Sequence, residues 1–246
     1  MKHHFHAIVA YDGTNYFGWQ ATKSGPSIQK SLAIAIEKVT QEKVIPEAAS
    51  RTDRGVHAEG QSISFVLSKP WDPHRLKRAM NTYLPPDIRV RQLNETFKDF
   101  HPTIQAVAKV YNYRLSLTPF QIPFDRLYAW HFPRPIDREV MEKSAALLLG
   151  SHNFSSFTSR ADKRPVCTLF SIETTYLDRT FQISLKGDRF LYKMARTIVG
   201  TLIYIGAGKL PIDIIVELLS CPDRRNAGMT APAHGLFLSS VIYSPP

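Results

Sequence analysis

The sequence predicts an α+β fold built from two similar halves. Apolar residues alternate along several short segments, as in half-buried strands, and recur every three or four residues along others, as in amphipathic helices. These segments follow one another as strand-helix-strand-strand-helix-strand, and this order occurs twice within 246 residues. Such an order is typical of ferredoxin-like β-α-β-β-α-β units with a mostly antiparallel sheet. The length and the 43% hydrophobic content suit one large domain or two small ones.

The first half begins with a predicted strand over residues 3–11. A helix is expected from Ser27, the probable N-cap by residue type, to about Gln41. Its apolar face consists of Ile28, Leu32, Ala35, Ile36 and Val39. Strands are expected over 44–49 and 63–67, a second helix from Pro73 to the Pro85-Pro86 pair, with Leu76, Met80 and Tyr83 on its face, and a strand over 88–93.

The second half repeats this order. The predicted elements are a strand over 106–117, a helix over 137–149 closed by Gly150, strands over 169–177 and 181–185, a helix from near Arg189 to about Ile205, a short helix carrying Ile214, Ile215 and Leu218, and a strand over 236–243. The predicted domains are therefore residues 1–104 and 105–246. The proline-rich link over 119–135 belongs to the second.

The charge of the chain favours a polyanionic partner. The 31 Lys and Arg residues against 21 Asp and Glu give a formal net charge of +10, which makes nucleic acid the leading partner. No membrane association is expected, because the charge-free stretch over 197–208 is too short to span a bilayer. The start of the chain has no apolar run of a secretory signal, so a cytoplasmic location is expected. Cys167 and Cys221 are isolated and are expected to be unpaired thiols.

The segment Ser50–Ala58 carries the clearest chemical signal. It places Asp53 between Arg51 and Arg54, directly before Gly55. The guanidinium groups favour an ionised carboxylate, and the glycine allows a sharp backbone turn. A catalytic aspartate is often presented in this way. By residue type alone, however, the same run also fits a solvated loop with weak surface ion pairs.

Five segments, taken together, decide between these interpretations. Ser50–Ala58 is similar to the signature Gly-Arg-Thr-Asp-Ala-Gly-Val-His, and Tyr11–Gln20 to Tyr-Asp-Gly-x-x-Tyr-x-Gly-Trp-Gln. Tyr111–Tyr113 is similar to a Tyr-x-Tyr strand, Phe190–Arg196 to a helix start Phe-Leu-x-x-Met-x-Arg, and Gly235–Leu238 to a closing Gly-Leu-Tyr-Leu strand. In this order, they resemble the tRNA pseudouridine synthase A family, and five ordered blocks are far more specific than one motif.

The resemblance implies a pseudouridine synthase fold and an isomerase that converts uridine to pseudouridine at positions 38, 39 and 40 of the tRNA anticodon stem-loop. It assigns Asp53 as the nucleophile and Arg196 as its cationic partner. Tyr111 matches the residue that packs against the target base. Arg51 matches the residue that occupies or braces the position vacated when the uridine flips out. The resemblance also implies a homodimer.

This chemistry predicts neither a cofactor nor a metal. The bond from ribose C1′ to N1 breaks and C1′ bonds to C5 instead, which requires no electrons or phosphate. The sequence contains no Gly-x-Gly-x-x-Gly fingerprint, and Gly208-Lys209-Leu210 lacks the pattern of a phosphate loop. His3, His4 and His6 have no accompanying cluster of cysteines or carboxylates. The place of His57 in the signature suggests that it supports the turn rather than acting as a base.

Two other functions remain open. One is a non-catalytic RNA-binding protein on the same fold, against which the joint presence of Asp53, Tyr111 and Arg196 argues. The other is a base hydrolase, which would need a second carboxylate, and Glu59 is the nearest. Three residues depart from the family pattern: Ser50 replaces a glycine, Arg54 an alanine and Lys193 a common histidine. None removes a reacting group, but they leave the set of target uridines undecided.

Overall fold

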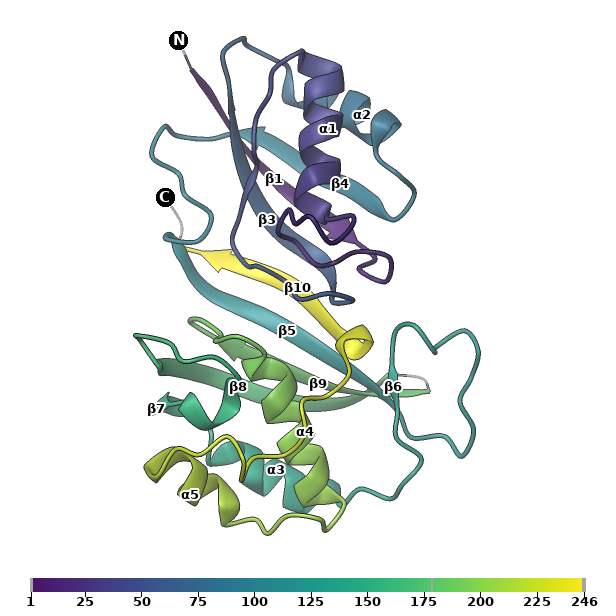
Figure 1. The fold of residues 1–246 in the computed structure, drawn as a ribbon, viewed down its shortest axis with the longest axis vertical. Helices are drawn as coiled ribbons and strands as arrows, with labels where there is room; N and C mark the ends of the chain where they lie inside the picture. Colours follow the sequence, from purple (N-terminus) through teal and green to yellow (C-terminus); the bar gives the residue numbers. More distant parts are fainter. Residues whose placement is uncertain (1, 178, 245–246) are drawn as a thin grey trace. The chain divides into compact units, whose positions relative to one another are not determined.

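The structure, a computed structural model, describes residues 2–177 and 179–244 (Figure 1). The predicted domains begin at Met1 and end at Pro246. Met1 and the Pro245-Pro246 pair lie outside the described residues. The chain forms two compact units. Unit 1 contains the residues up to Val107 and those from Phe237 onward, and unit 2 contains Ala108–Leu236. Each unit has its own strands, helices and buried core.

The strands of unit 1 are ordered β4-β1-β3-β10, with β2 also paired to β3. β1 is antiparallel to β3 and β4, and β2 is antiparallel to β3. β10 runs parallel to β3, with Phe237 opposite His57. Their bounds are β1 (His3–Tyr11), β2 (Glu47–Ala48), β3 (His57–Leu67), β4 (Ile88–Glu95) and β10 (Leu236–Tyr243).

Two capped helices accompany these strands. In α1 (Ile28–Thr40) the predicted N-cap is confirmed, because Ser27 Oγ accepts from Lys30 N at 3.3 Å. α2 (Pro73–Tyr83) has proline in its first turn, and Asp72 accepts from Arg75 N at 2.7 Å. The helices contact each other, and α2 packs on β4. Tyr83, predicted on the buried face, is 53% exposed, because the chain leaves the helix at Leu84 and buries that side chain instead.

In unit 2 the strand order is β5-β9-β8-β7, with antiparallel neighbours, and β6 pairs in parallel with the end of β5. The strands are β5 (Ala106–Ser116), β6 (Trp130–His131), β7 (Gly150–Asn153), β8 (Val166–Leu177) and β9 (Thr180–Gly187). The helices are α3 (Arg138–Ala146), α4 (Met194–Gly206) and α5 (Ile214–Ser220). α3 contacts α4 and β8, and α5 contacts β7 (Figure 1).

Several element boundaries differ from the sequence predictions. The strand expected over 44–49 is reduced to Glu47–Ala48, because Pro46 has no N–H to donate to a strand ladder. The helix expected from Arg189 begins only at Met194, because Lys193 adopts a left-handed conformation with φ 61°. The helix expected to reach residue 149 ends at Ala146. β6 and β7 were not predicted.

α4 is the most deeply buried helix of unit 2, since 11 of its 13 residues are buried. At Gly200 a Cβ atom would lie only 1.8 Å from the carbonyl oxygen of Met229, so no larger residue fits without displacing that segment. Gly228 N donates to Thr201 Oγ1 at 3.0 Å in the same contact. These contacts fix the middle of α4, about one turn after Arg196. Within the described residues, no helix is both long and apolar enough to cross a membrane.

Candidate active site

Asp53 lies in a tight turn that leads into β3. Val56 N donates to the carbonyl oxygen of Asp53 at 3.1 Å, and Gly55 has φ 75°, a region that glycine enters without steric cost. Thr52 is buried, the Asp53 side chain is half-buried, and Arg51 and Arg54 are exposed. The sharp turn expected from Gly55 is therefore present. It holds a carboxylate at the surface of unit 1 between two cationic side chains.

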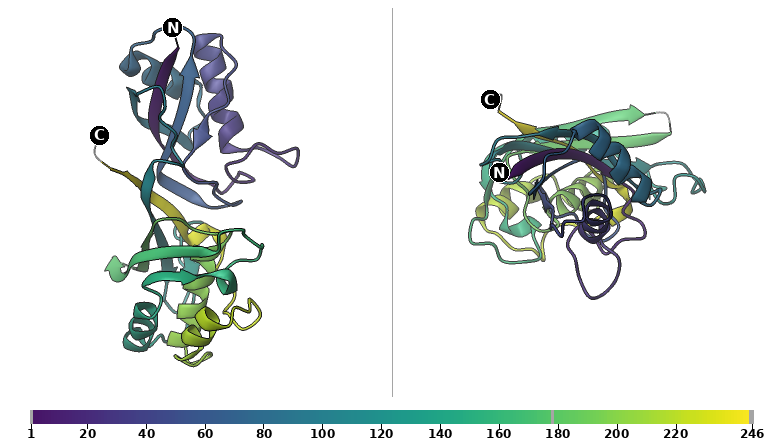
Figure 2. Two further views of the ribbon diagram at one scale, coloured as in Figure 1. Left: turned by 90° about the vertical axis from the view of Figure 1, so that its left-hand side faces the viewer. Right: turned by 90° about the horizontal axis from the view of Figure 1, so that it is seen from above.

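The loop between β1 and α1 packs directly on this turn. Trp19 N donates to Thr52 O at 3.0 Å, and Gly55 N donates to Tyr16 O at 3.4 Å. Gly18 has φ 93°, and a Cβ there would lie 2.5 Å from Thr52 O. The two backbones approach so closely that only glycine fits at this position. The part of this loop that precedes α1 extends away from the strands of unit 1 (Figure 2).

A buried polar network fixes the turn from the other side. Tyr11 OH and Thr52 Oγ1 are 2.8 Å apart, and Gln61 Nε2 lies 3.3 Å from Tyr11 OH. Gln61 also donates to Ser50 O at 2.7 Å and accepts from Ser50 N at 3.3 Å. The sequence analysis missed Gln61, which is fully buried. Its position two residues before Ile63, on the inward face of an alternating strand, was the available signal.

His57 supports the turn through contacts with the loop after β1. Its ring is 1% exposed and stacks on Phe237 with centroids 4.6 Å apart. Nδ1 lies 3.0 Å from Gly13 N and 3.1 Å from Asp12 Oδ1. An unprotonated Nδ1 accepts from Gly13, whereas a protonated one donates to Asp12, so these two contacts are alternatives. Both tie His57 to the loop after β1, which fits the supporting role suggested by its place in the signature.

Arg54, one of the departures from the family pattern, packs on an aromatic ring. Its guanidinium carbon lies 4.2 Å from the centroid of Phe17. This distance is typical of a cation–π contact. Arg54 thus adds one more link between the Asp53 turn and the loop that covers it.

The other two predicted site residues belong to unit 2. Tyr111, on β5, is 6% exposed, and its ring meets Phe190 edge-on with centroids 4.9 Å apart. Arg196 lies in the first turn of α4. Its Nε donates to Ala231 O at 2.7 Å, and Ala231 N donates back to Arg196 O at 3.1 Å. Nε is one of five guanidinium N–H donors, so this anchor orients the group without using all of it.

The charge of Arg196 acts on two neighbouring groups. Burial raises the pKa of Tyr113 well above its usual value, and the Arg196 cation opposes this shift. Burial lowers the pKa of His234, a hydrogen bond that the ring donates to the backbone of Ala129 opposes that shift, and Arg196 adds to it. Both effects place a positive potential at the start of α4, where an anionic group would be stabilised.

Each unit therefore carries two of the predicted site residues. Arg51 and Asp53 share one turn of unit 1. Tyr111 touches Phe190, the first residue of the unit 2 segment that ends in Arg196. The pairing of Asp53 with Arg196 joins the two units and stays a prediction.

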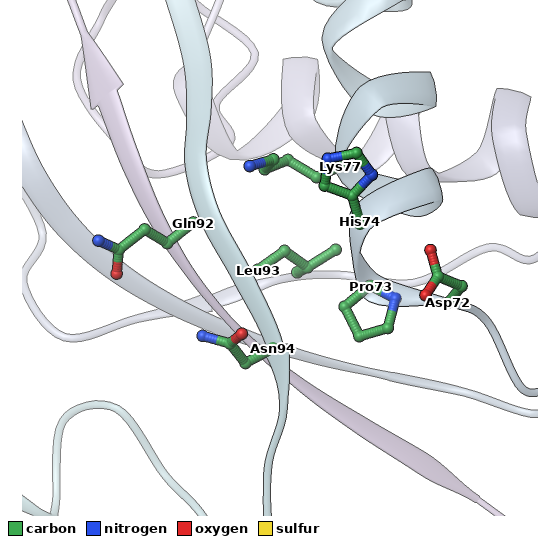
Figure 3. A pocket seen from close by; sticks show the side chains of 7 residues that line it. All are labelled: Asp72, Pro73, His74, Lys77, Gln92, Leu93 and Asn94. Atoms are coloured by element: carbon green, nitrogen blue, oxygen red, sulfur yellow. The ribbon is translucent and has the colours of Figure 1, made fainter.

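A separate cavity of about 430 Å³ lies in unit 1 between the start of α2 and β4 (Figure 3). His74 and Lys77 contribute from α2, and Gln92, Leu93 and Asn94 contribute from β4. None of the four predicted site residues lines it. In the part of the chain that the structure describes, no three His, Cys, Asp or Glu side chains are grouped so as to hold a metal ion.

Comparison with known proteins identifies the family. Residues 7–103 and 144–244 match the sequence model described as tRNA pseudouridine synthase. A protein of Protochlamydia amoebophila named tRNA pseudouridine synthase A 2 is 42% identical over 241 residues, which cover 96% of this chain and 92% of the relative. The tRNA pseudouridine synthase A of Thermoanaerobacter sp. is 40% identical, with 96% and 98% covered. That of Bacillus pumilus is 38% identical, with 96% and 97% covered. With these matches over nearly its whole length, the chain belongs to the tRNA pseudouridine synthase family, whose members are isomerases.

Proposed function

We propose that this protein converts uridine to pseudouridine at positions 38, 39 and 40 of the tRNA anticodon stem-loop, with Asp53 as the nucleophile and without a cofactor. The names of its relatives support the tRNA substrate and the isomerisation. The observation that carries the residue assignment is the Asp53 turn. Backbone contacts with Tyr16 and Trp19 on one side and the Gln61 network on the other hold it in one conformation.

The proposed reaction rearranges one base without a net change in its atoms. The ionised carboxylate of Asp53 attacks either the ribose or the uracil ring, and the bond between C1′ and N1 breaks. The base turns while still bound, C1′ then bonds to C5, and the bond between Asp53 and the substrate breaks, which restores the carboxylate. C5 gives up its hydrogen as a proton, and N1 gains a proton. Release of the C5 hydrogen to water is therefore a direct measure of turnover.

The other site residues hold the substrate and balance charge. A stacked uridine is inaccessible to a carboxylate, so the target base must leave its stack. Exposed Arg51, next to Asp53, occupies or braces the vacated position, and Tyr111 packs against the flipped base. Arg196 supplies the positive charge that keeps a partly sheltered carboxylate ionised. Its Nε anchor to Ala231 is compatible with this role, because it fixes the direction of the guanidinium.

The finer features of the fold are also proposals. We assign each half to a ferredoxin-like unit. The order β4-β1-β3 in unit 1, with β2 also paired to β3, and the order β5-β9-β8 in unit 2 support this assignment. The division into domains of residues 1–104 and 105–246 remains a proposal, as does a cytoplasmic location, where tRNA would be available.

Asp53→Asn is expected to abolish pseudouridine formation while preserving the fold and tRNA affinity. The amide is nearly isosteric with the carboxylate but is a poor nucleophile, so the rate should fall by about 10³-fold or more. The measurement is tritium release from tRNA labelled at uridine C5. Glu59→Gln is the matched control, because it neutralises the nearest other acid and should retain the wild-type rate within a few-fold.

The same assay separates the rival functions. An RNA-binding protein without activity would release no tritium from wild-type protein and tRNA, and a base hydrolase would yield free uracil and depend on a second carboxylate such as Glu59. Retention of more than a few per cent of the rate in Asp53→Asn would show that this residue is not the nucleophile.

Arg196→Met is expected to act on the rate through Asp53. The variant should lose most activity, and the double variant with Asp53→Asn should be no less active than Asp53→Asn alone, because a partner has nothing left to support once its carboxylate is gone. Loss of the bond to Ala231 O should lower stability by about 1 kcal/mol, which thermal unfolding measures separately. Full activity of Arg196→Met, or losses that multiply in the double variant, would contradict the pairing.

Binding of tRNA is expected to weaken with salt. The Lys163 and Arg164 side chains are exposed, whereas Arg224 donates to Gly228 O and Thr230 Oγ1, both at 3.0 Å, and Arg225 pairs with Asp223 at 2.7 Å. Each phosphate contact should add about 0.7 to 0.9 to the log-log slope of affinity against salt. Lys163→Ala should therefore reduce the slope by about that amount, and the control Arg225→Ala should leave it unchanged. Affinity that does not change across a salt series would contradict binding through phosphates.

The active species is expected to be a homodimer, an inference that rests on the family resemblance alone. Light scattering of the purified protein should give twice the chain mass of 27.9 kDa. The mass should be measured at the concentration used in the activity assay. A monomer with full activity there would refute the dimer.

A further inference from the structure

One aromatic side chain near Arg196 is exposed although its neighbours in the sequence are packed. Tyr192 is 43% exposed, whereas Leu191 and Met194 are buried. The guanidinium of Arg160 lies 5.2 Å from the centroid of the Tyr192 ring, and Lys193 Nζ lies 5.0 Å from it. Tyr192, Arg160 and Lys193 are called the Tyr192 platform below.

The backbone holds the members of this platform in place. Thr158 is 7% exposed, and its hydroxyl lies 3.0 Å from both Tyr192 O and Arg160 O, to one of which it donates at a time. The same oxygen accepts from Arg160 N at 3.3 Å. One buried hydroxyl thus connects two segments that are distant in the sequence. Tyr192 lies 34 residues after Thr158. The ring is exposed, but its attachment to unit 2 is rigid.

The backbone conformation of Lys193 is a second indication that the fold positions this platform. Lys193 has φ 61°, one of two non-glycine residues with positive φ among the described residues. Such a conformation costs energy and concentrates at functional sites. Here Lys193 shares a turn with Tyr192, its ammonium group lies over that ring, and α4 starts at the next residue. Tyr192 and Arg196 therefore lie within about one helical turn of each other in the sequence.

The charges around the platform favour an anionic partner. Arg160, Lys163 and Arg164 are exposed in the adjoining loop. Asp162 is already paired with Arg189 at 3.3 Å and accepts from Arg164 N. Cations around an exposed aromatic ring are the combination that binds unpaired nucleotides, because the ring stacks on the base while the cations meet the phosphates.

We propose that the ring of Tyr192 stacks on an unpaired base of the RNA substrate adjacent to the target uridine. The base takes the place of a cation on the ring face, while Arg160 and Lys193 meet the phosphates on either side of that base. The proposal rests on the proposed function, since it names a second contact for the same substrate. It extends the site from the reacting uridine to a neighbouring nucleotide. It also explains why a large ring remains exposed beside a well-packed helix start.

The test is the affinity for tRNA of the full-length chain, measured by fluorescence anisotropy over a salt series. Tyr192→Ala should bind roughly 5- to 150-fold more weakly, the range for loss of one stacked base, with an unchanged salt slope. Tyr192→Phe retains the ring and should bind within about twofold of wild type. Arg160→Ala should weaken binding and lower the salt slope by about 0.7 to 0.9. The different effects on the slope separate a stacking contact from a phosphate contact.

Tyr176→Ala is the matched control. Tyr176 is another exposed tyrosine of unit 2 with an arginine, Arg138, at 5.9 Å, but it is distant in sequence from Arg196. This variant should bind tRNA like wild type. Thermal unfolding of all variants shows whether they fold. If Tyr192→Ala unfolds, Tyr192→Leu takes its place, because leucine keeps apolar bulk without an aromatic face.

Tritium release by the wild-type protein separates this proposal from the proposed function. Absence of release would overturn the isomerase assignment whatever the Tyr192 variants do. With release intact, tRNA affinity of Tyr192→Ala within twofold of wild type would overturn the platform. So would an equal loss in Tyr176→Ala, which would indicate a general surface effect.

Discussion

The candidate site depends on the contact between two stretches of backbone, the loop at Gly18 and the turn at Asp53. Fixing the backbone of one residue costs about 1–2 kcal/mol in conformational entropy. The hydrogen bonds of Trp19 and Gly55 to the opposite stretch offset that cost during folding, before any RNA arrives. A turn that is ordered in advance does not have to be ordered again in the transition state, which is the basis of catalysis by orientation. The position of the carboxylate is thus a property of the main chain.

Buried neutral hydrogen bonds contribute more to this order than the charges on the surface. Exposed pairs such as Lys143 with Glu139 contribute little to stability and weaken with salt. Removing Gln61 would instead break its hydrogen bonds to the backbone of Ser50 and to Tyr11 OH, at about 0.5–1.5 kcal/mol for each bond. The difference explains how a chain with a net charge of +10 keeps a carboxylate in a defined place. The excess cations are not needed to shape the turn and remain available for a polyanion.

Much of the fold was predictable because it depends on local patterns. Alternation defined β1 and β4, and Ser27 and Pro73 marked the starts of α1 and α2 to within one residue. The boundary errors arose where one residue overrides the pattern. Pro46 cannot donate to a ladder, and the left-handed conformation of Lys193 delays α4. Two-residue strands such as β6 are too short to show a period.

The site was predictable only in part, for a different reason. Motifs gave Asp53, Tyr111 and Arg196, but contacts between residues far apart in the chain have no local signature. Two such contacts are those of Arg54 with Phe17 and of Gln61 with Ser50. They join residues that are separated in the sequence, so only the folded structure shows them. Tyr192 lay inside a recognised motif, yet its exposure could not be read from the alternation or from its neighbours.

The glycine contacts also bear on how such a site can diverge. At Gly13 a Cβ would lie 2.0 Å from Val56 O, and Gly18 is as restricted against Thr52. Mutation of either glycine would disrupt this packing whatever substrate is favoured, whereas Arg51 and Arg54 are exposed on the same turn, Arg54 against the ring of Phe17. The backbone contacts therefore constrain the two glycines but not the side chain at position 54. Duplicated copies of such a gene could drift toward different RNAs by exchanging Arg54, without losing the fold.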